Sequence, residues 1–229
     1  MLLRIFRSME GADPLEIFIQ VIATVAAVVI CLVVHEVCHG LAAYALGDPT
    51  AKRMGRFSFN PVRHIDPIGG LMLLFVGFGW AKPVQVDSRY FQNPKRDMAL
   101  TALAGPISNF IMAFIAAGIL LSTFETVVID GNIRFYVVDG IFKNAMFSFL
   151  QALVFLNIGL GVFNLIPIPP LDGSKVLATF LPSRIYWAYM QYERYGMFVL
   201  LFLMMTGSLS DFLGSFIDGI FRLMYKVWI

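Results

Sequence analysis

Three long stretches of the chain contain almost no charged side chains and predict membrane-spanning helices. They cover residues 17–47, 98–124 and 144–171. A helix that crosses the hydrocarbon core of a bilayer needs about 20 apolar residues, and each stretch exceeds that length. The pattern therefore predicts a multi-pass membrane protein.

The C-terminal part predicts two further helices with a weaker signal. Residues 195–210 form a marginal span, and residues 212–229 are apolar but interrupted by Asp218, Arg222 and Lys226. The last segment either spans the membrane or lies on its surface. The fold class that we expect is an all-α integral membrane protein with about four to five transmembrane helices.

The segment 48–97 is the least regular part of the chain. Its stretch 71–80 is apolar but too short to span, and residues 84–86 alternate as a β-strand does. Glycine and proline pairs interrupt it repeatedly and favour turns over a continuous helix: Asn60-Pro61, Asp66-Pro67, Gly69-Gly70 and Lys82-Pro83. We expect a re-entrant or interfacial segment with a short β-hairpin between the first two helices. A plain interfacial helix over the glycine-rich run is the alternative.

Composition and charge support the membrane assignment and predict an orientation. The 229 residues are 59% hydrophobic and 14% charged, whereas a soluble domain carries roughly a quarter charged residues. Segment 48–97 holds eight Lys and Arg residues, 172–194 holds three, and 125–143 holds two. The positive-inside rule then places 48–97 and 172–194 in the cytoplasm, where basic residues can also touch anionic lipid headgroups.

The first apolar stretch contains a metal-binding pattern. Residues 35–39 read His-Glu-Val-Cys-His, and an ionisable residue at membrane depth indicates function. In an α-helix a spacing of four places His35 and His39 on one face. Two such histidines can hold one zinc ion, with Glu36 beside it as the general base toward water at the metal. Cys38 projects about 100° away from His39 and is a less suitable ligand.

A catalytic zinc site usually has three protein ligands, so a third must come from elsewhere. The candidates are His64, in the basic segment, and Asp172. Asp172 follows Pro167, Pro169 and Pro170, which cannot continue a helix, so the backbone unwinds there. His39 and Asp172 both lie toward the cytoplasmic side, which favours Asp172 as the ligand. The alternative is that Asp172 only caps the helix that follows it.

Several motifs, in their order and spacing, resemble those of the site-2 proteases, which are zinc metalloproteases that cut substrate helices within the membrane. The resemblance runs from about residue 15 to 180. The motifs are His35-Glu36-Val37-Cys38-His39, Asn60-Pro61 with His64 and Asp66-Pro67, Gly79 with Lys82-Pro83-Val84, Ala104-Gly105-Pro106-Ile107-Ser108-Asn109, and residues Asn164–Gly173.

The resemblance implies specific roles. His35, His39 and Asp172 match the ligands of one zinc ion, and Glu36 matches the catalytic base. Asn164 matches an asparagine suggested to contact the substrate or its oxyanion, although it can instead bond to a helix backbone. The segment around Val84 would pair with an unfolded substrate strand.

The resemblance also implies a minimal family member. We expect it to lack the helix that in many members precedes the helix with the two histidines, and to lack PDZ and CBS modules. We expect one transmembrane metalloprotease domain over residues 1–229, with a catalytic core at about 15–180 and C-terminal helices at 193–229.

The function expected from these observations is intramembrane zinc metalloendopeptidase activity on a transmembrane protein or peptide, with the active site toward the cytoplasmic side of the cell membrane. The predicted partners are this substrate and membrane lipids, and no nucleic acid. The alternative is a membrane metal-binding or transport protein without proteolytic activity. Transport usually needs ligands on several helices, and one cluster is visible. Three histidines are too few and unsuitably spaced for a membrane haem oxidoreductase, and an intact Glu36 argues against an inactive scaffold.

Overall fold

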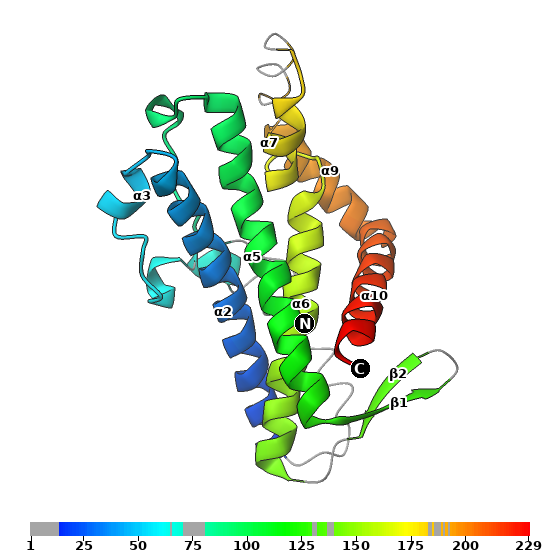
Figure 1. Ribbon diagram of the computed structural model, residues 1–229. Coiled ribbons are helices and arrows are strands. Elements are labelled where there is room, and N and C mark those ends of the chain that lie inside the picture. Colours follow the sequence, from blue (N-terminus) through cyan, green and yellow to red (C-terminus); the bar gives the residue numbers. More distant parts are fainter. Residues whose placement is uncertain are drawn as a thin grey trace.

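The structure is a computed structural model that describes residues 14–64, 66–70, 81–129, 132–136, 140–182, 185, 189, 191 and 193–229 (Figure 1). The segment 71–80, expected to be re-entrant or interfacial, lies outside the described residues. The α-helices are α2 (Pro14–Ala45), α3 (Thr50–Arg53), α5 (Pro94–Thr123), α6 (Ile141–Leu165), α7 (Asp172–Thr179), α9 (Glu193–Met205) and α10 (Ser208–Trp228). Two 3-10 turns, η1 (Pro61–Arg63) and η2 (Ser88–Tyr90), and two strands, β1 (Glu125–Ile129) and β2 (Asn132–Tyr136), complete the described elements.

The helices confirm the predicted all-α membrane class. Within the described residues, α2, α5 and α6 are long and apolar enough to cross a membrane. The helix segments Tyr195–Met205 and Ser208–Trp228 pass the same test only together, and they meet at a bend of 80°. Gly207 at this bend has a φ of 78°, a left-handed conformation that favours glycine. Against the expected four to five, the described residues thus contain three candidate spans, or four if the bent pair is one span.

The three long helices form the core of the bundle. α2, α5 and α6 pack against one another, and α10 covers α5 and α6 (Figure 1). Ala27 on α2 and Ala113 and Ala117 on α5 are fully buried between them. Small side chains let helix backbones approach closely, which is how transmembrane helices gain packing contacts in lipid. Leu120 on α5 and Ile158 on α6 are fully buried members of the same core cluster.

The structure describes one β-hairpin, and residues 84–86 are not part of it. Strands β1 and β2 pair antiparallel, with Glu125 opposite Tyr136, and lie between the second and third spans rather than between the first two. In the described part of segment 81–90, no β-strand is present at 84–86. Pro83 has no N–H to donate. The N–H groups of Val84 and Asp87 donate to the Glu36 and Asp48 carboxylates instead of to a partner strand.

The segment between α2 and α5 is attached to the end of α2 by buried polar groups. The Asp48 carboxylate is fully buried and accepts hydrogen bonds from the backbone N–H of Thr50 at 2.9 Å and of Asp87 at 2.7 Å. The guanidinium of Arg56 is also buried and donates to the carbonyl of Arg63. These bonds fix the irregular backbone beside the metal-binding part of α2.

The proline-rich segment ends α6 as predicted. α6 stops at Leu165, and a new helix, α7, begins at Asp172. A Cβ on Gly173 would overlap the backbone of Leu165 and Ile166, so this position requires glycine for the close turn. The turn carries Asp172 back toward α2 and α5.

Candidate active site

His35 and His39 lie one turn apart on α2 and face the bundle interior. Their ring centroids are 4.5 Å apart, and their Nε2 atoms are separated by 3.0 Å. Both side chains are buried. The spacing of four residues therefore has the consequence predicted from the sequence, which is two imidazole nitrogens directed at one point.

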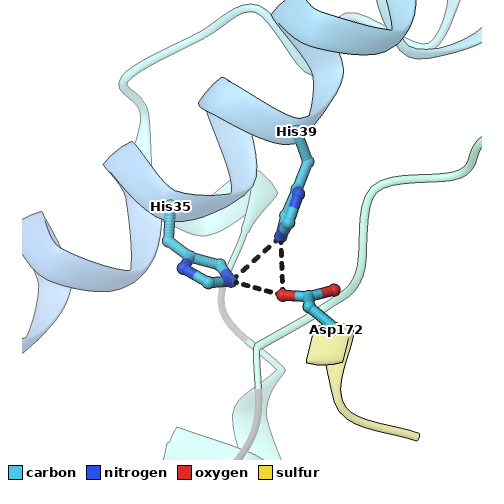
Figure 2. A group of neighbouring side chains, drawn as sticks. All are labelled: His35, His39 and Asp172. Carbon is cyan, nitrogen blue, oxygen red and sulfur yellow. Dashed lines mark hydrogen bonds and ion pairs between the residues drawn. The ribbon is translucent and has the colours of Figure 1, made fainter. Parts of the chain in front are cut away.

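Asp172 joins this pair from the far end of the sequence (Figure 2). Its Oδ2 lies 3.3 Å from His35 Nε2 and 3.1 Å from His39 Nε2. The three residues form a buried group whose ligand atoms all lie within 4.8 Å of one another, and it could hold a metal ion. Asp172 does not cap α7 with its side chain, because the N-cap position is Leu171 and no side-chain cap bond is present there. The capping alternative is therefore wrong.

The distances within this group suit a tetrahedral zinc ion. Ligands held at about 2.0–2.1 Å from zinc lie roughly 3.3 Å from one another in that geometry. The observed separations are 3.0, 3.1 and 3.3 Å. Two nitrogens and one carboxylate oxygen are also the donor set that zinc accepts in catalytic sites.

The other ring nitrogens both face acceptors. His39 Nδ1 lies 2.8 Å from the carbonyl oxygen of Thr101, and His35 Nδ1 lies 2.5 Å from Asn109 Oδ1. Each Nδ1 therefore carries a proton, and the Nε2 atom of a neutral imidazole then presents a lone pair. Two such nitrogens and the Asp172 carboxylate oxygen are a donor set that could hold a metal ion.

Helix α5 closes the site on its other side. A Cβ on Gly105 would overlap the imidazoles of both His35 and His39. Glycine here thus allows α2 and α5 to approach closely. Thr101 and Asn109, one turn on either side of Gly105, supply the partners of the two Nδ1 atoms.

Glu36 follows His35 and is half-buried beside the group. Its Oε2 accepts a hydrogen bond of 2.9 Å from the backbone N–H of Val84. On the Asp172 side, Lys175 Nζ lies 3.3 Å from Oδ1, the oxygen that is not directed at the histidines. A donor therefore holds one oxygen of each of these two carboxylates, and in Asp172 the other oxygen is directed at the histidines.

Three other candidates lie outside the three-residue metal group. Asn164 is half-buried and donates to the carbonyl of Leu160, on its own helix, at 3.0 Å. His64 is fully buried in the segment after α2, and its Nε2 lies 2.7 Å from the Ser58 carbonyl. Cys38 is half-buried on α2. His64, the other candidate for the third ligand, thus contacts its own segment and is not part of the metal group.

Two residues of the site were not predicted to contribute. The Thr101 carbonyl is a backbone group, which no sequence pattern reveals. Asn157 on α6 is fully buried and accepts from Asn109 Nδ2 at 2.6 Å. Its signal in the sequence is a polar amide in the middle of an apolar span, where polar side chains usually bond to another helix.

The sequence is similar to those of proteins named as zinc metalloproteases. Residues 23–207 match peptidase family M50. The chain is 35% identical over 184 residues to "Putative zinc metalloprotease YwhC" of Bacillus subtilis (strain 168), covering 80% of each protein. It is 24% identical over 196 residues to Rip2 of Mycolicibacterium smegmatis, covering 82% of this chain and 69% of that protein. It is 28% identical over 145 residues to "Zinc metalloprotease RasP" of Bacillus licheniformis, covering 62% of this chain and 27% of that one.

No solved structure matches the chain significantly. The family match covers most of the chain, and the relatives carry the zinc metalloprotease name. The chain therefore belongs to peptidase family M50, the site-2 protease family that its motifs resemble.

Proposed function

We propose that this protein is an intramembrane zinc metalloendopeptidase that hydrolyses a peptide bond within or near a transmembrane segment of a membrane-protein substrate. The observation that carries the proposal is the convergence of His35, His39 and Asp172 within the apolar helix bundle. A zinc ion bound there would lower the pKa of water and polarise the scissile carbonyl.

Glu36 is the proposed general base. Its carboxylate takes a proton from the attacking water as the water oxygen bonds to the carbonyl carbon. It then delivers that proton to the amide nitrogen as the C–N bond breaks, so the carboxylate is regenerated. The bond from Val84 N–H to Oε2 orients this carboxylate, and the second oxygen is the one available to water.

Substrate binding is assigned to two neighbouring regions. The irregular backbone at 82–87 passes beside Glu36, so an extended substrate could pair there through main-chain hydrogen bonds. Asn164 precedes the unwound segment that leads to Asp172. Among the described residues, Asn164 donates from Nδ2 to the Leu160 carbonyl, and its Oδ1 could accept from a substrate N–H. A transmembrane helix must unwind before either contact can form.

The proposal extends to the placement of the protein in the membrane. The basic segments 48–97 and 172–194 support an orientation in which the active site opens toward the cytoplasm, at the cell membrane. We also propose that residues 1–229 act as one catalytic domain, because α7, which carries Asp172, packs on both α5 and α6.

A metal-transport function is the alternative that uses the same ligands. Among the described residues, His35, His39 and Asp172 form the single group that could hold a metal ion. A second metal-binding site along a transport path is therefore not apparent there. Nothing in the described structure favours transport over hydrolysis.

The test is cleavage of a transmembrane peptide by protein reconstituted in lipid vesicles. We expect cleavage that a zinc chelator abolishes, and a decrease of about 10²–10⁴-fold in Glu36→Gln, since that is the usual contribution of a general base. The variant should still bind one zinc ion. Glu16→Gln, at the other end of α2, is the matched control and should cleave normally. Undiminished cleavage by Glu36→Gln would overturn the proposal.

A further inference from the structure

A row of buried amides connects the metal group to the interior of α6. His35 Nδ1 lies 2.5 Å from Asn109 Oδ1 on α5. Asn109 Nδ2 donates to Asn157 Oδ1 on α6 at 2.6 Å. Asn157 Nδ2 in turn donates to the backbone carbonyl of Leu153, four residues earlier on the same helix, at 2.7 Å. We propose that Asn157 is a positioning residue that fixes the tautomer of His35 through Asn109, and so sets the affinity of the site for zinc.

The direction of the hydrogen bonds along this row follows from the last acceptor, the Leu153 carbonyl. A carbonyl oxygen can only accept, so the Asn157 group that faces Leu153 must be the NH₂. Asn157 then presents its oxygen to Asn109, so Asn109 must donate from its own NH₂ group. The oxygen of Asn109 is thereby turned toward His35, whose Nδ1 must carry the proton. The Nε2 lone pair is left for the metal.

Because both amides are buried, only this orientation satisfies their hydrogen bonds. Asn109 and Asn157 are both fully buried, so water cannot replace a misdirected partner. An inverted amide would place two acceptors or two donors against each other, and an unsatisfied buried polar group costs about 1–3 kcal/mol. His39 needs no such row, because its Nδ1 donates directly to the Thr101 carbonyl. The two ligand tautomers are thus set by backbone carbonyls, one directly and one through two amides.

The thiol of Cys31 is not the group that sets the direction. Its Sγ lies 2.8 Å from Asn157 Nδ2, as a second partner beside the Leu153 carbonyl. A thiol can donate or accept weakly, so it is compatible with either amide orientation. We therefore expect Cys31→Ala to leave zinc affinity within about twofold of wild type.

The inference rests on the proposed zinc site, and zinc binding by the wild type tests that site separately. The experiment is zinc titration of the full chain in detergent against a competing chromophoric chelator. Asn157→Leu should weaken zinc binding by about tenfold or more, the usual effect of losing an outer partner of a metal ligand. The Co²⁺-substituted variant should also show an altered visible absorption spectrum, because one ligand is no longer held.

Asn144→Leu is the matched control for this substitution. It removes an amide from the same helix, and that amide also bonds to α2, through Glu16 Oε1 at 3.4 Å. This variant should retain wild-type zinc affinity and cobalt spectrum. Wild-type affinity in folded Asn157→Leu would overturn the inference while leaving the zinc site intact. Failure of the wild type to bind zinc would overturn the proposed function itself.

A rescue experiment separates orientation from a general packing role. In the double variant Asn109→Asp/Asn157→Leu, the carboxylate has acceptor oxygens on both sides and needs no partner to orient it. It should hold His35 in the same tautomer, as carboxylates do in many zinc sites. We expect zinc affinity at least fivefold above that of Asn157→Leu. A double variant that binds zinc no better than Asn157→Leu would contradict the tautomer argument, even if both proteins fold less well than wild type.

Discussion

The two ends of the helix bundle differ in what they bury. Every buried polar or charged side chain among the described residues belongs to the end with the metal group. These side chains lie in the second half of α2, in the segment 48–97, at residues 101 and 109 of α5, at Asn157 and in α7. The other end carries the hairpin (Figure 1) and buries apolar side chains from the remaining parts of the same helices, together with α10. The long helices α2, α5 and α6 therefore carry polar side chains toward one end of the bundle and apolar packing contacts toward the other.

Because of this difference, we expect substitutions at the two ends to affect different properties of the protein. At the metal end, the ligands and amides each depend on a partner of the correct polarity, so a substitution there alters binding or catalysis. At the hairpin end, the contacts are van der Waals contacts between closely packed side chains, so a substitution alters the stability of the bundle. Effects at sites far apart usually add. The comparison thus predicts that the two properties can be changed independently.

The largest effect is expected for Asp172→Ala. Structural zinc sites bind with about 10–16 kcal/mol shared among four ligands, or about 2.5–4 kcal/mol for each. Removing Asp172 should therefore weaken zinc binding by two to three orders of magnitude and abolish peptide cleavage, with little change in the thermal unfolding of the metal-free protein. Zinc titration and unfolding measurements on the same preparation check both parts.

Lys175→Ala is the control for that substitution. Lys175 contacts Oδ1 of Asp172, the oxygen that faces away from the histidines, and its side chain is partly exposed. We expect at most a few-fold change in zinc affinity, since ion pairs of this kind contribute about 0–1 kcal/mol. Equal losses in the two variants would show that charge near the site matters more than ligation.

A smaller effect, on stability alone, is expected for Leu120→Ala at the hairpin end. Leu120 is fully buried in the core cluster of α5. Leu→Ala substitutions in cores cost about 2–5 kcal/mol. The lower end of that range applies here, because lipid is as apolar as the protein interior and mainly packing contacts are lost. Zinc affinity of the folded protein should remain at the wild-type value, and a large decrease would show that the two ends are coupled.

Sequence reasoning was most informative at the metal end, for a physical reason. His35, Glu36 and His39 stand out because ionisable residues are costly in a membrane span. Asp172 stands out because prolines end α6 directly before it. The amides Asn109 and Asn157 do not stand out in the same way, because such residues also serve ordinary helix packing. Which amide faces which histidine depends on how three helices pack, and the sequence does not encode that locally.

The sequence pattern was misleading at residues 84–86, where a strand was expected and none is described. Residues 84–86 alternate like a strand, but side chains of α2 take the N–H groups of Val84 and Asp87. The strands that do pair, β1 and β2, flank Asp130-Gly131 in the sequence, which is a strong two-residue turn signal between β-rich segments. A pattern of alternation alone was thus less reliable than the turn residues.

The smallest effect is expected where the irregular segment is attached to α2. Asp48→Ala removes the acceptor of the backbone N–H groups of Thr50 and Asp87. This should loosen residues 82–87 beside Glu36 by about 1 kcal/mol, and hydrogen exchange at the Val84 amide should accelerate by about fivefold. Zinc affinity should not change, because none of the three ligands contacts Asp48 in the described structure.

Asp87→Ala is the matched control, since it deletes a carboxylate from the same segment but keeps the backbone N–H that bonds to Asp48. In the wild type, Asp87 forms an ion pair with the exposed Arg89, and hydrogen bonds from Arg89 lower the pKa of the Asp87 carboxyl. Such pairs stabilise little, and exchange at Val84 should stay at the wild-type rate. Faster exchange in Asp87→Ala than in Asp48→Ala would mean that this surface pair, and not the buried Asp48 carboxylate, holds the segment in place.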